Sequence, residues 1–431
     1  MGVALADLTL RDTAAPPERR VFLAAGVIAS NAPDLDLLYL RLTPPPLGYL
    51  LHHRGYSHTI AGLLLLGVLL PLALRLSPAA RRLSSAEGVR LLTLMWVSLV
   101  GHVLFDALNS YGVHPFYPLD VRWYYGDAVF IFEPWLWLVL GISAGWTLQN
   151  RTARFAMFTL IAVLPIMFTF LGIVPIGALI MLGIAGGVFM WVGNRLSPRV
   201  RAAGALAITV LGCAGMFALS HAVEAATRAA LAPTVRGAIL DVIRTPNPSS
   251  PLCWSVITVE KNEIEDTVVL RRGTMSLLPA WQPPTSCASW RFTRRALDRA
   301  RDRPTRTDPD GNRMGAPTAR PAGPERGTGA PASDGDGGSG GAKPPGLAWT
   351  DEIRESLTGL RDLGAQDCWA RAWLQFGRAP VLRDGRLFDL RFDNGTGRNF
   401  TTLTLTTERD AGCPPHVTPW ALPREELLEG H

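Results

Sequence analysis

Long apolar runs alternate with short polar segments over the first half of the chain. Residues 60–74, 91–104 and 155–190 carry almost no charged side chain. Because about 20 mainly apolar residues in a helix cross the hydrocarbon core of a bilayer, the pattern predicts a mainly α, polytopic membrane helix bundle. About seven spans are expected, at residues 20–40, 59–76, 90–109, 129–148, 154–172, 174–192 and 203–221.

Composition supports this prediction. The 431 residues are 48% hydrophobic but 18% charged, whereas soluble proteins average about 25% charged. A single soluble domain is therefore excluded. The first span is interrupted by Asp34 and Asp36, and residues 2–10 are expected to form a short extra helix before it. No cleavable signal peptide is evident at the N-terminus.

Arginines predict how the bundle is oriented. Twelve lie in one set of ends and loops, whereas the opposite set has three, Arg41, Arg54 and Arg122. Positive charge favours the cytoplasmic side, so the N-terminus is expected there. Seven spans then place everything after about residue 222 outside the cytoplasm of a multi-pass inner membrane protein. The twelve are Arg11, Arg19, Arg20, Arg75, Arg81, Arg82, Arg90, Arg151, Arg154, Arg195, Arg199 and Arg201.

Four of the five cysteines follow the last span, whereas Cys213 lies within it. An even number in an oxidising compartment favours two disulfides, with three connectivities open. The absence of CxxC argues against a zinc ribbon. The four are Cys253, Cys287, Cys368 and Cys413.

The C-terminal part is predicted to be β-rich and split by a disordered, Pro- and Gly-rich insertion. Strands are expected at residues 238–243, 255–260, 267–271, 387–392 and 400–406, and a helix at 350–376. The predicted division is a membrane domain at 1–222, an outer domain at 223–296 and 347–431, and the insertion at 297–346.

The basic excess, 42 Lys and Arg against 36 Asp and Glu, does not indicate a nucleic-acid partner. Almost all cations are arginine, and many lie at the ends of apolar runs. No basic stripe is interleaved with stacking aromatics. The expected partners are the bilayer and a small-molecule or lipid substrate, whereas the oligomeric state is not predicted.

Polar segments that interrupt or border the apolar runs hold most of the histidines. Ionisable groups at membrane depth are costly, so each is a functional candidate. His102 and Asp106 share a helical face, and Pro33 breaks the helix before the two aspartates. The predicted topology puts all these segments at the outer ends of their helices. They are residues 31–36, 52–58, 101–106 and 109–114, and Glu133.

Imidazole and carboxylate groups in this number suit a divalent metal, Zn²⁺ first with Mn²⁺ or Fe²⁺ as alternatives. A two-metal cluster with a bridging water is also open, and Glu133 or a spare histidine then serves as general base or acid. Each residue also has a structural explanation. These are a helix-terminus turn for Asp34 and Asp36, an intrahelical hydrogen bond for His102 and Asp106, a solvated loop for His52, snorkelling for Arg54, a helix cap for Glu133, and interfacial positions for His114 and His221.

Three ordered motifs carry a family resemblance. Residues 31–36 read N-A-P-D-L-D, residues 53–59 read H-R-G-Y-S-H-T, and residues 101–106 read G-H-V-L-F-D, with N-S-Y-G at 109–112. Over about residues 1–140 they resemble the membrane-bound metal-dependent hydrolase family of bacterial inner membranes, the YdjM-like group. The likeness extends weakly to residues 247–254 and 388–392.

The resemblance implies a ligand set and a role for one arginine. Arg54 would serve an anionic substrate group. Relatives carry a Thr-His pair just before the segment that opens this chain, so either translation starts further upstream or the site lacks one ligand. Relatives also often have Asp at the position of Glu133. The implied ligands are Asp34, Asp36, His53, His58, His102 and Asp106.

The resulting prediction is a metal-dependent hydrolase of an ester or phosphoester, with a lipid or envelope precursor as a candidate substrate. Glu133 and Arg54 are the expected catalytic residues. Two alternatives are a proton or metal transporter and a non-enzymatic envelope scaffold. A proton or metal relay would need ionisable groups distributed through the depth of the membrane, whereas these side chains are predicted to lie together at one side of it.

Overall fold

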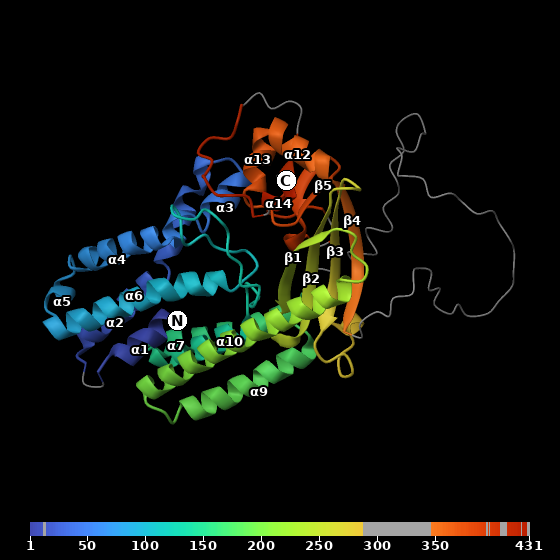
Figure 1. The fold of residues 1–431 in the computed structure, drawn as a ribbon. Helices are drawn as coiled ribbons and strands as arrows, with labels where there is room; N and C mark the ends of the chain where they lie inside the picture. The colour runs from blue at the N-terminus through green and yellow to red at the C-terminus, as the bar shows by residue number, and fades with distance from the viewer. Residues whose placement is uncertain are drawn as a thin grey trace, which may run out of the picture.

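A helical part and a sheet-containing part lie side by side (Figure 1). The first half of the chain forms most of the helices, and the described residues of the C-terminal half form the sheets, three further α-helices and two 3₁₀-helices. The computed structural model describes residues 1–11, 14–287, 346–393, 395, 397–405, 412–423 and 425–428. The predicted insertion at 297–346 lies outside these residues except for Gly346.

Ten α-helices and two 3₁₀-helices make up the described residues of the helical part. The predicted short helix at the N-terminus is present as α1. The elements are α1 (Gly2–Thr9), α2 (Pro16–Ala29), η1 (Ala32–Leu42), α3 (Leu47–His52), η2 (Tyr56–His58), α4 (Ile60–Leu74), α5 (Pro78–Arg81), α6 (Ser85–Ala107), α7 (Pro134–Thr147), α8 (Arg151–Phe170), α9 (Ile176–Gly193) and α10 (Pro198–Leu231).

Among the described residues, four helices are long and apolar enough to cross a membrane: α6, α8, α9 and α10. The number rises to six if α2 with η1 and α3–η2 with α4 each form one bent span. The seven predicted spans are not all found, because α7 has only 14 residues. At 1.5 Å per residue it is about 21 Å long, short of the roughly 30 Å hydrocarbon core.

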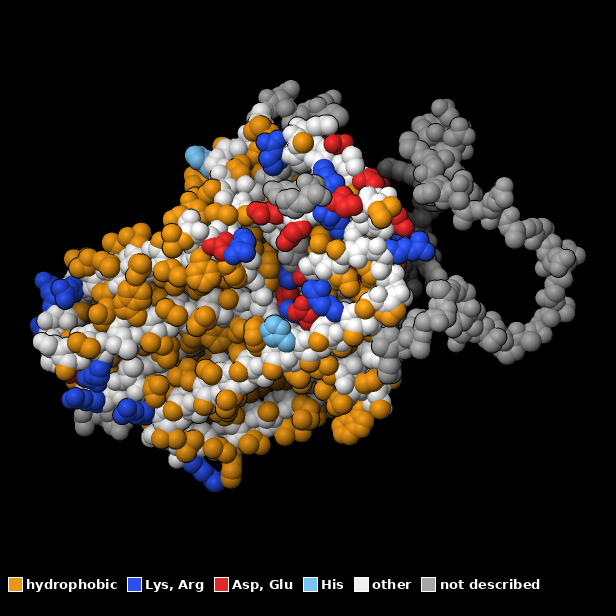
Figure 2. Space-filling view, viewed as in Figure 1, with side chains coloured by type: hydrophobic (Ala, Val, Ile, Leu, Met, Phe, Trp, Pro, Cys, Tyr) orange, Lys and Arg blue, Asp and Glu red, His pale blue; other side chains and the backbone are white. Residues whose placement is uncertain are grey.

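The surface of the helical part is that of a membrane-embedded protein. Leu65 on α4 is 59% exposed and Ile180 on α9 is 57% exposed. The residues next to each of them in the sequence are also apolar. Figure 2 shows hydrophobic side chains over most of the helical part, with Lys and Arg at the end that faces away from the sheet. Lipid is the solvent that such a surface suits.

The bend between α2 and η1 positions two of the predicted site residues. The chain turns by 43° between these helices. Pro33 follows Ala32 here, and a proline disfavours helical backbone at the preceding residue. The tighter 3₁₀ helix that results carries Asp34 on a partly exposed face and Asp36 fully buried.

An antiparallel sheet of four strands, in the order β1-β2-β3-β4, follows α10. Its strands are β1 (Ala238–Asn247), β2 (Ser250–Asn262), β3 (Thr267–Ser276) and β4 (Leu347–Ser356). The three predicted strands of this region are therefore confirmed and are longer than expected. One face packs on α10, where Val223 contacts a cluster that includes Trp254 and Val256.

The predicted helix at 350–376 is wrong over its first seven residues. Residues 350–356 belong to β4, where exposed and half-buried side chains alternate. Pairing with β3 explains the outcome, since Glu352 and Asp351 each form an ion pair with an arginine of β3. Ser356 then caps the following helix by accepting a hydrogen bond from the Gly359 N–H.

A second, smaller sheet lies beyond that helix. The remaining described elements are η3 (Pro284–Ser286), α12 (Leu357–Gln366), α13 (Cys368–Leu374), β5 (Pro380–Arg383), β6 (Arg386–Asp389), η4 (Leu390–Phe392), β7 (Leu403–Thr404) and α14 (Glu425–Leu428). The predicted strands at 387–392 and 400–406 are thus found in shortened form. Two disulfides are also found, as predicted: Cys253–Cys287 and Cys368–Cys413.

The C-terminal part packs tightly on the loops that carry the motifs. One apolar core joins residues of α3 and the 109–128 loop, such as Leu50 and Tyr111, to Trp373 and Trp420. Arg378 adds a buried ion pair to Asp127 at 2.7 Å and another to Asp241 at 2.7 Å. The loops that carry the motifs are therefore held between the helical part and the C-terminal part.

Candidate metal centre

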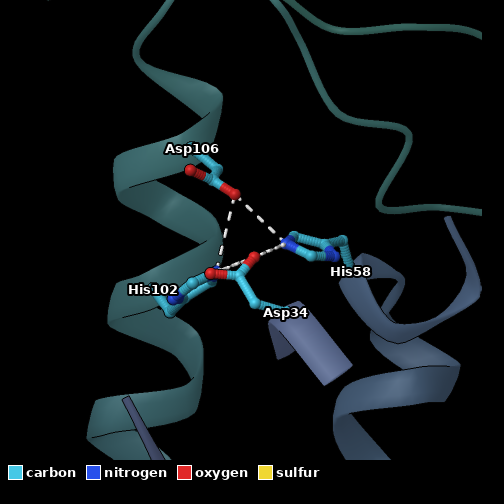
Figure 3. A group of neighbouring side chains, drawn as sticks. All are labelled: Asp34, His58, His102 and Asp106. Carbon is cyan, nitrogen blue, oxygen red and sulfur yellow. Dashed lines mark hydrogen bonds and ion pairs between the residues drawn. The ribbon is translucent and has the colours of Figure 1, made fainter. Parts of the chain in front are cut away.

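Three separate segments bring the predicted polar side chains together. Asp34 comes from η1, His58 from η2, and His102 and Asp106 from successive turns of α6 (Figure 3). One donor atom from each lies within 4.8 Å of the others. The predicted crowding of these groups at one place is therefore present in the structure.

The spacing of the four donor atoms fits one tetrahedral ion. The His58 Nε2 atom lies 3.6 Å from Asp34 Oδ1 and 3.1 Å from Asp106 Oδ2. The His102 Nε2 atom lies 3.4 Å and 3.5 Å from the same two oxygens, and 3.3 Å from His58 Nε2. Tetrahedral Zn²⁺ with bonds of 2.0–2.1 Å requires ligand atoms about 3.3 Å apart. Five of the six separations among the four donor atoms are 3.1–3.6 Å and thus have about this size.

The outer nitrogens of the two imidazoles direct the inner ones toward the cluster. His102 Nδ1 lies 2.8 Å from the Ser30 carbonyl, which can only accept a hydrogen bond. Nδ1 therefore carries the proton. His58 Nδ1 lies 3.2 Å from Asp36 Oδ2, which holds that ring in the same way. In the neutral rings, both Nε2 lone pairs then face the same point, as metal-binding histidines require.

A second group of donors adjoins the first and shares one residue with it. Atoms of Asp34, Asp36 and His53 lie within 4.8 Å of one another. Asp36 is fully buried, and its Oδ2 accepts hydrogen bonds from the Arg54 N–H and the Ser57 hydroxyl. All six predicted ligands thus belong to two neighbouring donor groups that share Asp34.

Arg54 lies beside the cluster and is 3% exposed. Its φ of +61° is unusual for a residue with a side chain. The Nη2 atom pairs with Asp106 Oδ1 at 3.0 Å, and Nη1 donates to Asn109 Oδ1 at 2.9 Å. The guanidinium also lies 4.7 Å from the centre of the Tyr111 ring. It is therefore held by protein groups and does not snorkel to the interface.

Glu133 is buried and immediately precedes α7, yet its side chain makes no capping hydrogen bond to that helix. Instead, its carboxylate accepts from the N–H and hydroxyl of Ser249, in the turn between β1 and β2. Glu133 lines a cavity of about 320 Å³ together with Arg54, His102 and Asp106. A carboxylate, an arginine and the cluster thus face one space.

Three other histidines do not join the cluster. His52 is buried and lies 2.8 Å from the Thr43 hydroxyl, so it is not a solvated loop residue. His114 is buried between the rings of Trp123 and Trp420. His221 lies on α10 with a 58% exposed side chain.

Two partners of the site went unnoticed at the level of sequence. Ser30 contributes a backbone carbonyl, which leaves no signature in side-chain type. Ser249 has a φ of +57° in a tight turn 116 residues from Glu133 in the chain. Only Asn109, within the N-S-Y-G segment, carried a signal that could have marked it as the partner of Arg54.

Comparison with known proteins covers the same part of the chain. Residues 1–176 match the family model described as YdjM inner membrane protein. The uncharacterized protein YfhP of Bacillus subtilis (strain 168) is 27% identical over 141 residues, which are 32% of this chain and 41% of that relative. The match therefore spans about two fifths of the relative's length. No solved structure matches. Residues 1–176, which contain all six clustered side chains, thus match the YdjM inner membrane protein family, as the three motifs predicted.

Proposed function

We propose that this protein is a metal-dependent hydrolase of the inner membrane that cleaves an ester or phosphoester. The observation that carries the proposal is the close grouping of two imidazole nitrogens and two carboxylate oxygens from Asp34, His58, His102 and Asp106. The mixed N and O donors, without cysteine, suit an ion of catalytic rather than closed structural type, and favour Zn²⁺ over harder cations.

The second donor group makes room for a second ion. Asp34, Asp36 and His53 would hold it. A divalent ion bound here would act as a Lewis acid and lower the pKa of its water toward neutrality. Whether one ion or two are bound, Asp36 would orient the His58 ring through the Nδ1 atom of that ring.

The protein's own residues have separate roles in the proposed reaction. Glu133 faces the cavity and would accept a proton from the attacking water, then return it to the leaving oxygen. Arg54 is held rigidly, so it would stabilise negative charge developing on the substrate without reorganising. The ester or phosphoester linkage would lie in the same cavity, between these two side chains.

We further propose that the cluster and the C-terminal part face the outside of the cell. Lys and Arg side chains gather at one end of the helical part (Figure 2), the sheet lies at the opposite end (Figure 1), and both disulfides lie in the C-terminal part. Disulfides persist in oxidising compartments. This orientation requires α7 to act as a seventh, shorter crossing. Labelling of a tag at each terminus in intact cells tests it, since only the C-terminal tag should react.

Metal analysis of the full-length protein, purified in detergent without chelators, tests the proposed centre. The wild type should carry a divalent transition metal and hydrolyse a chromogenic phosphoester, while His102→Ala and Asp106→Ala should lose both. His221→Ala is the matched control, because it removes an exposed histidine outside the cluster. A wild-type protein that binds no metal would refute the centre. The cluster would then be a set of ion pairs between imidazolium and carboxylate groups.

A further inference from the structure

A large apolar cavity adjoins the proposed centre. It measures about 1120 Å³, above the roughly 300–1,000 Å³ of ordinary small-molecule sites. Its wall comes from both halves of the chain: Trp137 from α7, Phe168 from α8, Ile173 from the α8–α9 turn, and Phe392 and Phe400 from the C-terminal part. The cavity therefore exists only where the membrane helices meet the C-terminal part.

Shared walls connect this cavity to the catalytic one. Phe130, Ile131 and Trp137 line both the apolar cavity and the smaller cavity that contains His102 and Asp106. On another side, two tyrosines separate the apolar cavity from the ligands. The Tyr49 ring lies 4.9 Å from the His53 ring, and the Tyr111 ring contacts Arg54. A molecule in the apolar cavity is thus one side chain away from the cluster.

Exposed apolar side chains line part of this cavity. Ile131, Phe132 and Phe400 are 45%, 52% and 48% exposed. A hydrocarbon chain that enters the cavity from a bilayer stays in apolar surroundings, so its entry carries no cost of exposure to water. The rim also contains one exposed cation, Arg41.

We infer that the substrate is a membrane lipid with a phosphate-containing head group, whose hydrocarbon chain occupies this apolar cavity while the phosphate lies at the cluster. This inference rests on the proposed function. Charge complementarity supports the head group, since Arg54 lies at the cluster and Arg41 at the rim. A water-soluble phosphoester would leave the apolar cavity without an occupant.

Photolabelling in vesicles tests where the chain binds. The probe is phosphatidic acid with a diazirine at mid-chain, mixed into phosphatidylcholine vesicles that contain the full-length protein. Labelled peptides should map to Phe168, Phe400 and Trp137, and unlabelled phosphatidic acid should compete. Labelling spread over the exposed faces of α8 and α9 alone would overturn the inference, because it would report ordinary bilayer lipid.

A cavity-filling variant supplies the matched comparison. Ile173→Trp narrows the cavity and should lower labelling of Phe168 and Phe400 about tenfold, which corresponds to about 1.4 kcal/mol of binding free energy. Ile176→Trp, three residues further on, is 71% exposed and does not line the cavity, so labelling should be unchanged. Equal labelling in both variants would overturn the inference.

The lipid site and the proposed function fail in different ways. If labelling maps to the cavity although the protein binds no metal and hydrolyses nothing, the lipid site stands and the hydrolase proposal falls. If the protein hydrolyses a soluble phosphoester but the cavity residues are never labelled, the hydrolase proposal stands and the lipid inference falls.

Discussion

Asp36→Asn is the sharpest test of the proposed centre, because it removes one charge and almost no volume. The Asp36 carboxylate is fully buried and lies 3.2 Å from His58 Nδ1 through Oδ2 and 3.2 Å from His53 Nδ1 through Oδ1. Asparagine retains an acceptor for the Arg54 N–H, which donates to Oδ2 at 2.7 Å. The turn that carries the histidines should therefore stay folded.

The expected effect is on metal affinity. A carboxylate that accepts a proton-bearing nitrogen from a ligating histidine raises the basicity of that ligand, and its loss costs about 10–100-fold in affinity. That is roughly 1.4–2.8 kcal/mol. If Asp36 also binds a second ion directly, the number of bound ions should fall as well.

Competition with a chromophoric chelator measures this affinity on the detergent-purified protein. Asp362→Asn is the control, because it neutralises an exposed carboxylate of α12 far from the cluster in the chain. Thermal unfolding in the absence of metal checks that Asp36→Asn folds. An Asp36→Asn protein that folds and binds metal within twofold of the wild type would show that Asp36 neither ligates nor orients a ligand.

Three further predictions concern stability, each measured by unfolding of the purified protein. Arg378→Met leaves the buried carboxylates of Asp127 and Asp241 without this partner and should cost about 3–5 kcal/mol; a loss below 1 kcal/mol would contradict the buried ion pairs. Burial lowers the pKa of His114 from 6.5 to about 3, so the unfolded chain binds its proton first as the pH falls. This should destabilise the fold by about 2 kcal/mol between pH 8 and pH 5, and His114→Phe should remove that part of the pH dependence. Replacing both Cys368 and Cys413 with Ser opens a loop closed across 45 residues and should lower the free energy of unfolding by about 2–4 kcal/mol. Because this disulfide is then absent, reductant should cause no further loss of stability through it.

The candidate site was largely predictable because it depends on residue types and on spacings of a few residues. His102 and Asp106 are four residues apart in an apolar run, and a helix places such residues on one face. Pro33 marked the break that places Asp34 and Asp36. The predicted topology placed His58 on the same side of the membrane, whereas the resemblance to an inner membrane family supplied His53 as a ligand, and the family match over residues 1–176 supports that resemblance.

Two local predictions differ from the structure. Residues 350–356 carry charges at a spacing compatible with a helix, but pairing with β3 makes them a strand, and that partner is far away in the chain. Residues 129–148 are apolar enough for a span, but α7 begins only at Pro134, and proline is favoured at the first position of a helix. The start of α7 is therefore marked locally.

By itself, the sequence determined that the chain has apolar helices, four paired cysteines after them, and carboxylates and imidazoles at the helix ends. Those features depend on composition and on spacings of a few residues. Only the tertiary structure decided which cysteines pair, which nitrogen of each histidine faces the cluster, and that an apolar cavity lies beside it. Those depend on how the fold brings together residues tens or hundreds of positions apart, such as Trp137 and Phe400, which line one cavity and which no local pattern connects.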